Sequence, residues 1–285
     1  MTHVSSSADA MSVTATARSR GMTQFGAVLG QGFRDRAGLS VSVAGLLVVM
    51  GLFVGALWPP LRSTFAGLPV GVLDTITTLL AGADLRTPSG WVNAELLSVL
   101  APGGIIAVGV ISTAHALAGE EDRNTLGVLL SAPLRRGRFL IAKTAATVLH
   151  VLVVLIGLAL GLILDTVVGG LPLPVAGILG ACAHAGLLGV LFVAVTVLIC
   201  AATGRRVVSA ATAGGLAALA FVLNVLLPLV HSVSTLVKAD PWYYFAAADP
   251  LANGLRPAHL LVLAVTAVVV FGIAVAVYDR RDLRG

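Results

Sequence analysis

Charged residues are scarce in this chain of 285 residues. Asp, Glu, Lys and Arg together make up only 11% of it, while hydrophobic residues make up 58% and mean hydropathy is +1.00. A soluble globular protein carries roughly 25% charged residues, because water must solvate most of its surface. The scarcity of charge therefore excludes an ordinary soluble domain and predicts that most of the surface faces lipid.

Cysteine is nearly absent, and so is any leader-like segment. Cys182 and Cys200 are the two cysteines, and they share one apolar run. Eighteen residues of helix would separate them by about 27 Å, so we expect no disulfide between them. Residues 1–20 are rich in Ser, Thr and Ala and lack the apolar core of a signal peptide. We expect no cleaved signal peptide and a disordered N-terminal arm over 1–20.

Motifs for catalysis, nucleotides and metals are also missing. The nearest approach to a phosphate-binding loop is Gly137 to Thr144, but Ala142 stands where glycine is needed and the spacing is wrong. His115, His150 and His184 fall at different depths without ligand spacing, so we interpret them as single, locally satisfied histidines. The sequence predicts no catalytic centre, no bound cofactor and no metal site in this chain.

Long apolar runs are what the chain does contain. About 20 uncharged residues suffice to cross a bilayer as a helix, and six runs are long enough. Because lipid offers no partner to free backbone groups, we predict an all-α membrane protein with six transmembrane helices over residues 21–285. The fourth run, of 30 residues, is expected to tilt or to kink at a glycine. The expected spans are 39–58, 96–117, 144–164, 175–204, 207–230 and 260–278.

The distribution of basic residues predicts the orientation. Fourteen of the 18 Lys and Arg residues fall on the side that would hold both termini, and four on the other. Basic loops stay in the cytoplasm, so both termini are expected there. Trp58, Trp91 and Trp242 fall at or near outer ends of spans, where aromatic rings are favoured. Because the basic residues lie between apolar runs and not on one face, a nucleic-acid partner is not expected.

Three segments outside the spans are expected to contain short helices. Residues 25–33 favour an N-terminal interfacial helix, although a loop with scattered apolar residues remains an alternative. A stretch from Pro69 is too short to span and is expected to lie on the outer surface or to dip part-way into the membrane. Asp-Pro pairs at 240–241 and 249–250 are helix-start signals, so short outer helices are expected between 231 and 259.

The loop between the second and third spans has the most informative pattern. Acidic residues open it, Leu126, Leu129 and Leu130 form an apolar stripe, and Pro133 ends it before a basic cluster. We interpret it as a short cytoplasmic helix that docks a protein partner; lying flat on lipid is the alternative. The candidate docking residues are Glu120, Glu121, Arg123, Thr125, Leu126, Leu129, Leu130, Pro133, Arg135 and Arg136.

Two features inside the spans leave alternatives open. Asn224 is an amide within the fifth run, where it would either bond across helices or line a substrate path. The patterns Gly51-x-x-x-Gly55 and Gly157-x-x-x-Gly161 are typical of helix packing. With 32 glycines in the chain such pairs arise by chance, so no packing is predicted from them.

The loop resembles that of membrane subunits of type-2 ABC exporters. Many of these carry Glu-x-x-x-Gly-Thr-Leu-x-x-Leu-Leu-Ser-x-Pro-x-x-Arg and then a Lys at the start of the third span. This chain departs from the pattern at Asn124, which replaces the Gly. Segments 242–255 and 278–283 are similar to the same family, so the likeness runs from about 22 to 283. The matching loop residues are Glu120, Thr125, Leu126, Leu129, Leu130, Ser131, Pro133, Arg136 and Lys143.

The resemblance implies a permease subunit with no ATP site of its own, in the inner membrane of a bacterium. Its loop would be the coupling helix that rests on a nucleotide-binding ATPase, which binds ATP and Mg. Two permease halves, identical or different, would pair with two ATPases. The sparse polarity of the spans suits export of an amphiphilic or hydrophobic cargo such as a drug, an antibiotic or a lipid-like metabolite. Alternatives are copper-enzyme maturation, polysaccharide export, or a non-transporting scaffold or sensor.

Overall fold

The computed structural model describes residues 37–67, 71, 84–121, 136–168 and 170–280, and these contain helices and no strand. Six helices are long and apolar enough to cross a membrane, which confirms the all-α, six-span prediction. In chain order the elements are α2 (Ala37–Ala66), α4 (Pro88–Val92), the π-helical turn η1 (Asn93–Leu97), α5 (Leu100–Glu121), α7 (Arg136–Val167), α8 (Val175–Thr203), α9 (Arg206–Leu226), the 3-10 helices η2 (Leu227–Leu229) and η3 (His231–Ala239), α10 (Pro241–Ala246), α11 (Pro250–Asn253) and α12 (Pro257–Arg280).

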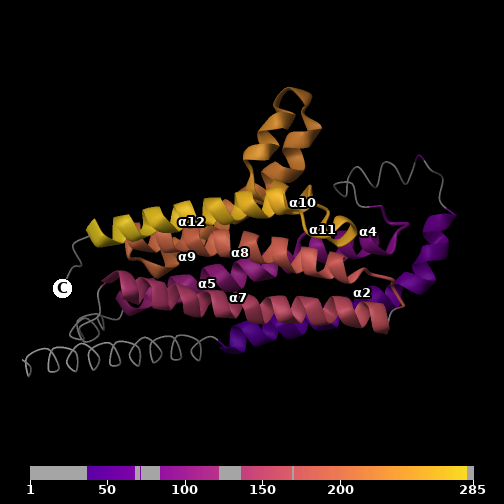
Figure 1. Ribbon diagram of the computed structural model, residues 1–285, viewed down its shortest axis with the longest axis horizontal. Coiled ribbons are helices and arrows are strands. Elements are labelled where there is room, and N and C mark those ends of the chain that lie inside the picture. Colours follow the sequence, from indigo (N-terminus) through magenta and orange to yellow (C-terminus); the bar gives the residue numbers. More distant parts are fainter. Residues whose placement is uncertain (1–36, 68–70, 72–83, 122–135, 169, 281–285) are drawn as a thin grey trace, which may run out of the picture.

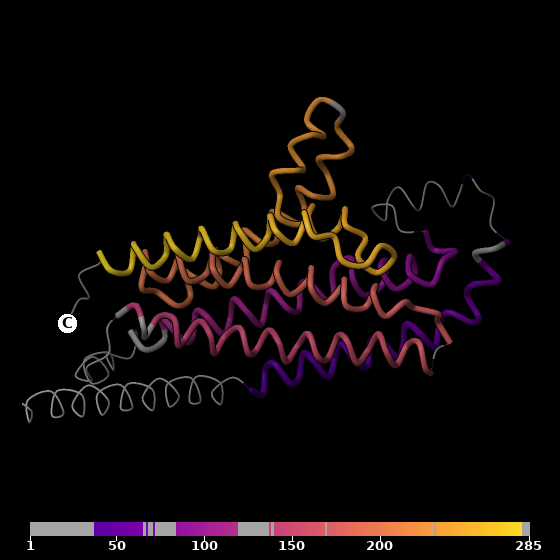
Figure 2. Tube along the Cα trace, viewed as in Figure 1, coloured from indigo at the N-terminus to yellow at the C-terminus, as the bar shows by residue number. Residues whose placement is uncertain are grey.

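The long helices form a bundle around α8 (Figure 1). Helix α8 packs against α12, α5, α7 and α9, while α2 packs on the outside against α7. We call the end where α8 turns into α9 the near end, and the end where α7 is followed by α8 the far end. Figure 2 shows that the last turns of α9, with η2 and η3, stand out sideways from the bundle. Helix α9 is therefore the least enclosed of the six: 11% of its most apolar stretch is buried, against 67% for α8.

Local signals place most helix ends. Helix α8 is a single helix over Val175–Thr203, and Gly204 follows it with a φ of 64°, the left-handed conformation that terminates helices. Helices α10 and α11 begin at Pro241 and Pro250, which confirms the short helices expected from the two Asp-Pro pairs. The N-terminal interfacial helix, the stretch from Pro69, the centre of the loop at 122–135 and the tail at 281–285 lie outside the described residues.

Helix α7 differs from the prediction because it extends past the apolar run at both ends. The membrane-length segment Leu140–Val167 includes Lys143 and Asp165, which are 5% and 0% exposed. The expected span 144–164 stops short of both residues, so the helix is longer than the uncharged run from which the span was predicted. The helix continues through charged residues because its backbone hydrogen bonds do not depend on side-chain polarity.

Helices α2 and α7 approach each other through glycine. A Cβ on Gly51 would lie 2.8 Å from the Cα of Gly161, and one on Gly157 would lie 2.6 Å from the Cα of Ala44. A Cβ on Gly55 would collide with the carboxylate of Asp165. The two Gly-x-x-x-Gly patterns thus face each other across one contact, which chance statistics alone did not reveal.

Candidate functional site

A groove lies between α5 and α9, on the face that the bundle leaves least covered. Its inner section is a cavity of about 380 Å³ walled by α5, α9 and Trp242 of α10. A Cβ on Gly103 or on Gly214 would meet no atom within 4 Å, so both glycines border open space. The inner section is lined by Val99, Gly103, Ile106, Ala107, Val110, Ile111, Ala210, Gly214, Ala217, Ala218, Phe221 and Trp242.

The groove continues toward the far end into a second cavity of about 390 Å³. The two sections share Val99, Phe221 and Trp242, so we treat them together as the α5–α9 groove. Three uncharged polar side chains line the outer section. Among the described residues, neither section is lined by an acid, a lysine, an arginine or a histidine. The outer section is lined by Asn93, Ser98, Val99, Phe221, Val222, Asn224, Val225, Leu226, Trp242, Phe245 and Ala246.

Asn224, singled out from the sequence, stands in the wall of the outer section. It is half-buried, and its side-chain amide has no hydrogen bond to another described residue. Asn93, which lies just before the expected second span, lines the same section, and its side-chain amide likewise has no hydrogen bond to a described residue. The groove therefore holds two amides whose donors and acceptors are available to a bound molecule.

A π-helical turn places Asn93 and Ser98 at the groove. In η1 the backbone N–H of Ser98 donates to the carbonyl of Asn93 at 2.7 Å, so this turn is wider than an α-helical one. Such turns recur at functional sites in helices. Sequence patterns do not identify a π turn, so the approach of Asn93 to α9 could not be predicted.

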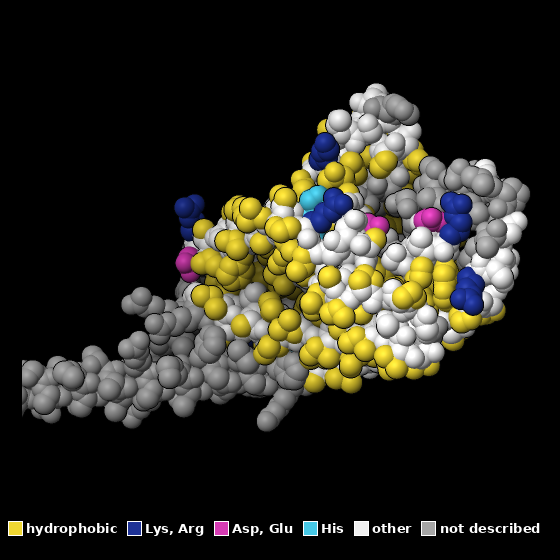
Figure 3. Space-filling model, turned by 45° about the vertical axis from the view of Figure 1, so that its right-hand side comes forward, with side chains coloured by type: hydrophobic (Ala, Val, Ile, Leu, Met, Phe, Trp, Pro, Cys, Tyr) yellow, Lys and Arg dark blue, Asp and Glu magenta, His cyan; other side chains and the backbone are white. Residues whose placement is uncertain are grey.

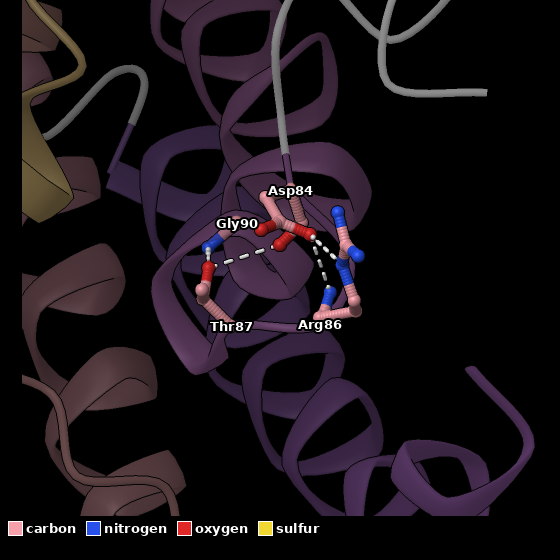
Figure 4. Close-up of polar contacts among 4 residues, drawn as sticks. All are labelled: Asp84, Arg86, Thr87 and Gly90. Carbon is pink, nitrogen blue, oxygen red and sulfur yellow. Dashed lines mark hydrogen bonds and ion pairs between the residues drawn. The ribbon is translucent and has the colours of Figure 1, made fainter. Parts of the chain in front are cut away.

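A polar turn anchors the start of this helix (Figure 4). Thr87 Oγ1 accepts a hydrogen bond from the backbone N–H of Gly90 at 3.0 Å and donates to the carbonyl of Asp84 at 2.9 Å, which caps α4. The backbone N–H and the guanidinium of Arg86 both donate to the Asp84 carboxylate, at 3.0 and 3.1 Å, and they hold its pKa below the ordinary value. The turn fixes where the segment leading to Asn93 begins.

Trp242 forms the wall that the two sections share, and it is held from both sides. The Asp240 carboxylate accepts a hydrogen bond from the backbone N–H of Trp242 at 2.9 Å and so caps α10. The indole N–H donates to the carbonyl of Ala217 in α9 at 3.2 Å, and the indole meets Phe221 edge-on at 5.1 Å. Burial raises the pKa of the Asp240 carboxyl. A tryptophan interpreted from sequence as an interfacial anchor is thus a groove residue.

Each of the three histidines singled out from the sequence has a hydrogen-bond partner. His115 Nε2 accepts from the Arg206 guanidinium at 2.8 Å, which links the near end of α5 to the start of α9. His150 Nδ1 lies 3.1 Å from the Ser40 hydroxyl of α2, and His184 Nδ1 lies 2.8 Å from the carbonyl of Gly180. Within the described ranges no three His, Cys, Asp or Glu residues gather as metal ligands would. These contacts lie apart from one another, and His184 Nε2 is buried without a hydrogen-bond partner in the described part of the chain.

The predicted docking loop is described only at its two ends. Helix α5 ends at Glu121, directly after Glu120, and helix α7 begins at Arg136, both at the near end. Arg123, Thr125, Leu126, Leu129, Leu130, Pro133 and Arg135 lie outside the described residues.

The surface and fold define the class of protein. Figure 3 shows hydrophobic side chains over most of the visible face of the described bundle, with charged side chains toward its ends and near the protruding segment. Six membrane-length helices with such a surface define a multi-pass membrane protein. Residues 31–283 match the family model for the ABC-2 family transporter protein, and the chain belongs to that family. No match was found among curated proteins or among solved structures.

Membership in this family establishes the general role of the chain. The chain is a membrane permease subunit of an ABC transporter, which is a transport component and not itself catalytic. It works with an ATP-binding subunit.

Proposed function

We propose that this permease exports an amphiphilic or hydrophobic substrate through the α5–α9 groove, driven by ATP that a separate subunit hydrolyses. The observation that carries the proposal is the groove itself, which is uncharged, of a size typical for small-molecule sites, about 300–1,000 Å³, and open beside the least buried helix. Low polarity along this path suits a cargo taken from lipid.

In this proposal the near end faces the cytoplasm of a bacterial cell, and both termini lie on the cytoplasmic side of the inner membrane. Support comes from the excess of Lys and Arg in the segments that end there. The docking residues Leu126, Leu129 and Leu130 then insert into the ATPase, while Glu120, Glu121, Arg123, Arg135 and Arg136 set the register at the rim. ATP and Mg are bound by that ATPase, which is present in two copies, one for each of two permease halves.

The open face of α9 supports pairing with a second permease half. Leu216, Leu219 and Leu226 of α9 are 45%, 53% and 51% exposed, so a second copy or a homologous chain would extend the groove into a shared cavity. The hydrogen bond between His115 and Arg206 gives a route from the docking loop to this face, because it ties the helix that leads into the loop to α9. Movement of the loop would then shift both walls of the groove.

The test is co-purification with a nucleotide-binding ATPase subunit, followed by substrate-stimulated ATP hydrolysis in proteoliposomes. Leu129→Asp/Leu130→Asp should abolish assembly or stimulation, since buried apolar anchors each contribute on the order of 2 kcal/mol to an interface. Glu121→Ala should do less, because an exposed ion pair contributes about 0–1 kcal/mol. Wild-type assembly and stimulation in the double variant would show that the loop lies on lipid. Assembly without transport of any cargo would favour a scaffold or sensor.

A further inference from the structure

The α5–α9 groove separates apolar and polar surface along its length. Its inner section, toward the near end, is lined by aliphatic and aromatic residues and glycine. Its outer section adds the side chains of Asn93, Ser98 and Asn224. A molecule that follows the groove therefore meets apolar surface along its body and hydrogen-bonding groups at one end.

Among the residues that the structure describes, none at the polar end carries a charge that would balance a charged ligand. The hydroxyl of Ser98 donates to the carbonyl of Ala94, which leaves its oxygen as an acceptor. The amides of Asn93 and Asn224 each offer donors and an acceptor, and no described residue uses them. A charged head group would lose hydration here without gaining a counter-charge, which is costly in a low-dielectric site. A hydroxyl or amide head group would instead exchange water for the three side chains.

A neighbouring groove shows the opposite chemistry. A cavity of about 390 Å³ between α8 and α12, under η3 and α10, includes Lys238 in its lining. Tyr244 from α10 lines this second groove, and Trp242 from the same helix lines the first. A lysine thus lines the groove on one side of α10, while the described lining of the α5–α9 groove on the other side has no charged residue.

From these observations we infer that the α5–α9 groove selects amphiphiles with an uncharged, hydrogen-bonding head group and rejects amphiphiles with an ammonium, sulfate or phosphate head. The head group binds between Asn93 and Asn224, and the apolar body lies along α5 and α9 past Phe221. This inference rests on the proposed function, and it adds the chemical class of the cargo.

Photolabelling of the purified permease–ATPase complex in nanodiscs tests the site. The probe is an alkyl glucoside with a diazirine near the head of its chain, and competitors are alkyl glucoside, alkyl trimethylammonium and alkyl sulfate of the same chain length. We expect labelled peptides from 93–110 or 206–226, and competition by the glucoside at concentrations about tenfold below those of the charged competitors. Equal competition by all three, or labelling confined to the α8–α12 groove, would overturn the inference.

Substitution of Asn224 sharpens the test. Asn224→Asp should reverse the order of the competitors, so that alkyl trimethylammonium competes better than the glucoside. Leu223→Asp is the control: it places the same carboxylate on the neighbouring residue, outside the lining, and should leave the order of the competitors unchanged. Asn224→Leu should weaken glucoside labelling about tenfold, and Asn224→Gln should restore part of it. Identical preferences in wild type and Asn224→Asp would also overturn the inference. If the aspartate variants insert poorly, the Leu and Gln variants decide, and glucoside labelling of Asn224→Leu at the wild-type level would overturn it.

Measurements of ATP hydrolysis and of ATPase binding distinguish failure of the head-group inference from failure of the proposed function. If ATPase activity is stimulated equally by neutral and charged amphiphiles, the head-group selection is wrong and the exporter stands. If the glucoside labels the groove but no ATPase binds the permease, the proposed function fails while the binding site remains.

Discussion

Glycine has opposite roles in two helix pairs of this bundle. Between α2 and α7, Gly51, Gly157 and Gly161 bring one helix so close to the other that an added Cβ would meet backbone atoms within 3 Å. Between α5 and α9, Gly103 and Gly214 face open space in the wall of a groove. The first pair is closed and the second is open, so glycine content alone says nothing about how tightly a helix packs.

The difference indicates which part of the bundle is rigid. Close backbone contact along α2 and α7, with the Ser40–His150 hydrogen bond between them, leaves little room for sliding. Helix α9 has few partners beyond α5, α8 and Trp242, and it is fastened at its start by Arg206. We expect α9 to move against a fixed α2–α7 pair during transport.

The largest effect is expected from filling the closed contact. Gly51→Leu should prevent folding or destabilise the protein by about 3 kcal/mol or more, because backbone atoms cannot yield to a side chain as rotamers can. Gly45→Leu is the matched control on the same helix, since a Cβ there meets nothing within 4 Å. Thermal unfolding of both variants in detergent checks the prediction. Equal unfolding temperatures for Gly51→Leu and wild type would show that α2 and α7 are not closely packed.

Filling the open groove should remove transport and leave the fold intact. Gly214→Leu places a side chain in the inner section, where its Cβ meets no atom within 4 Å. We expect wild-type unfolding behaviour, wild-type assembly with the ATPase, and at least about a tenfold loss of substrate stimulation, as a blocked site of about 380 Å³ would cause. Gly215→Leu, one residue along and outside the lining, should retain stimulation. If both variants transport equally, the groove is not the path.

Local signals explain what the sequence could predict. Six apolar runs predicted six helices, and Asp-Pro pairs predicted the starts of α10 and α11 because both depend on neighbouring residues. Contacts between distant segments could not be predicted. Which Gly-x-x-x-Gly pattern faces which depends on tertiary packing, and so does the meeting of Asn93 with Asn224 across 131 positions of chain. Asp165 was missed because a search for uncharged runs ends at the first acid.

A smaller effect is expected from substitution of Asp165, the acidic residue at the contact between α2 and α7. Asp165 is 0% exposed beside Gly55, and neither carboxylate oxygen accepts a hydrogen bond of ordinary geometry from the described part of the chain. An unpaired buried carboxylate costs free energy that a neutral side chain of the same shape does not. Asp165→Asn should therefore unfold at or above the wild-type temperature. A loss of about 1 kcal/mol or more on this substitution would mean that the carboxylate has a stabilising partner in the membrane.

The smallest effect tests the cap that holds Trp242 in the groove wall, and it depends on pH. Burial raises the pKa of Asp240 in the folded protein above the ordinary 3.8, so the folded state disfavours the ionised carboxylate relative to the unfolded chain. The carboxyl is neutral in both states below that value, and wild type loses stability as pH rises from there through the raised pKa. Asparagine caps a helix about as well as aspartate. Asp240→Asn should thus match wild type near pH 4 and unfold at a slightly higher temperature at pH 8, with the difference in unfolding temperature growing as pH rises.

Asp84→Asn is the control of opposite sign. The pKa of Asp84 is lowered by its hydrogen bonds to Arg86, so ionised Asp84 stabilises the fold above pH 3.8 and the variant should unfold at a slightly lower temperature than wild type at pH 8. A gap for Asp240→Asn that does not change between pH 4 and pH 8 would show that its carboxylate is not desolvated, and that Trp242 is held by the indole hydrogen bond to Ala217 and not by a buried cap.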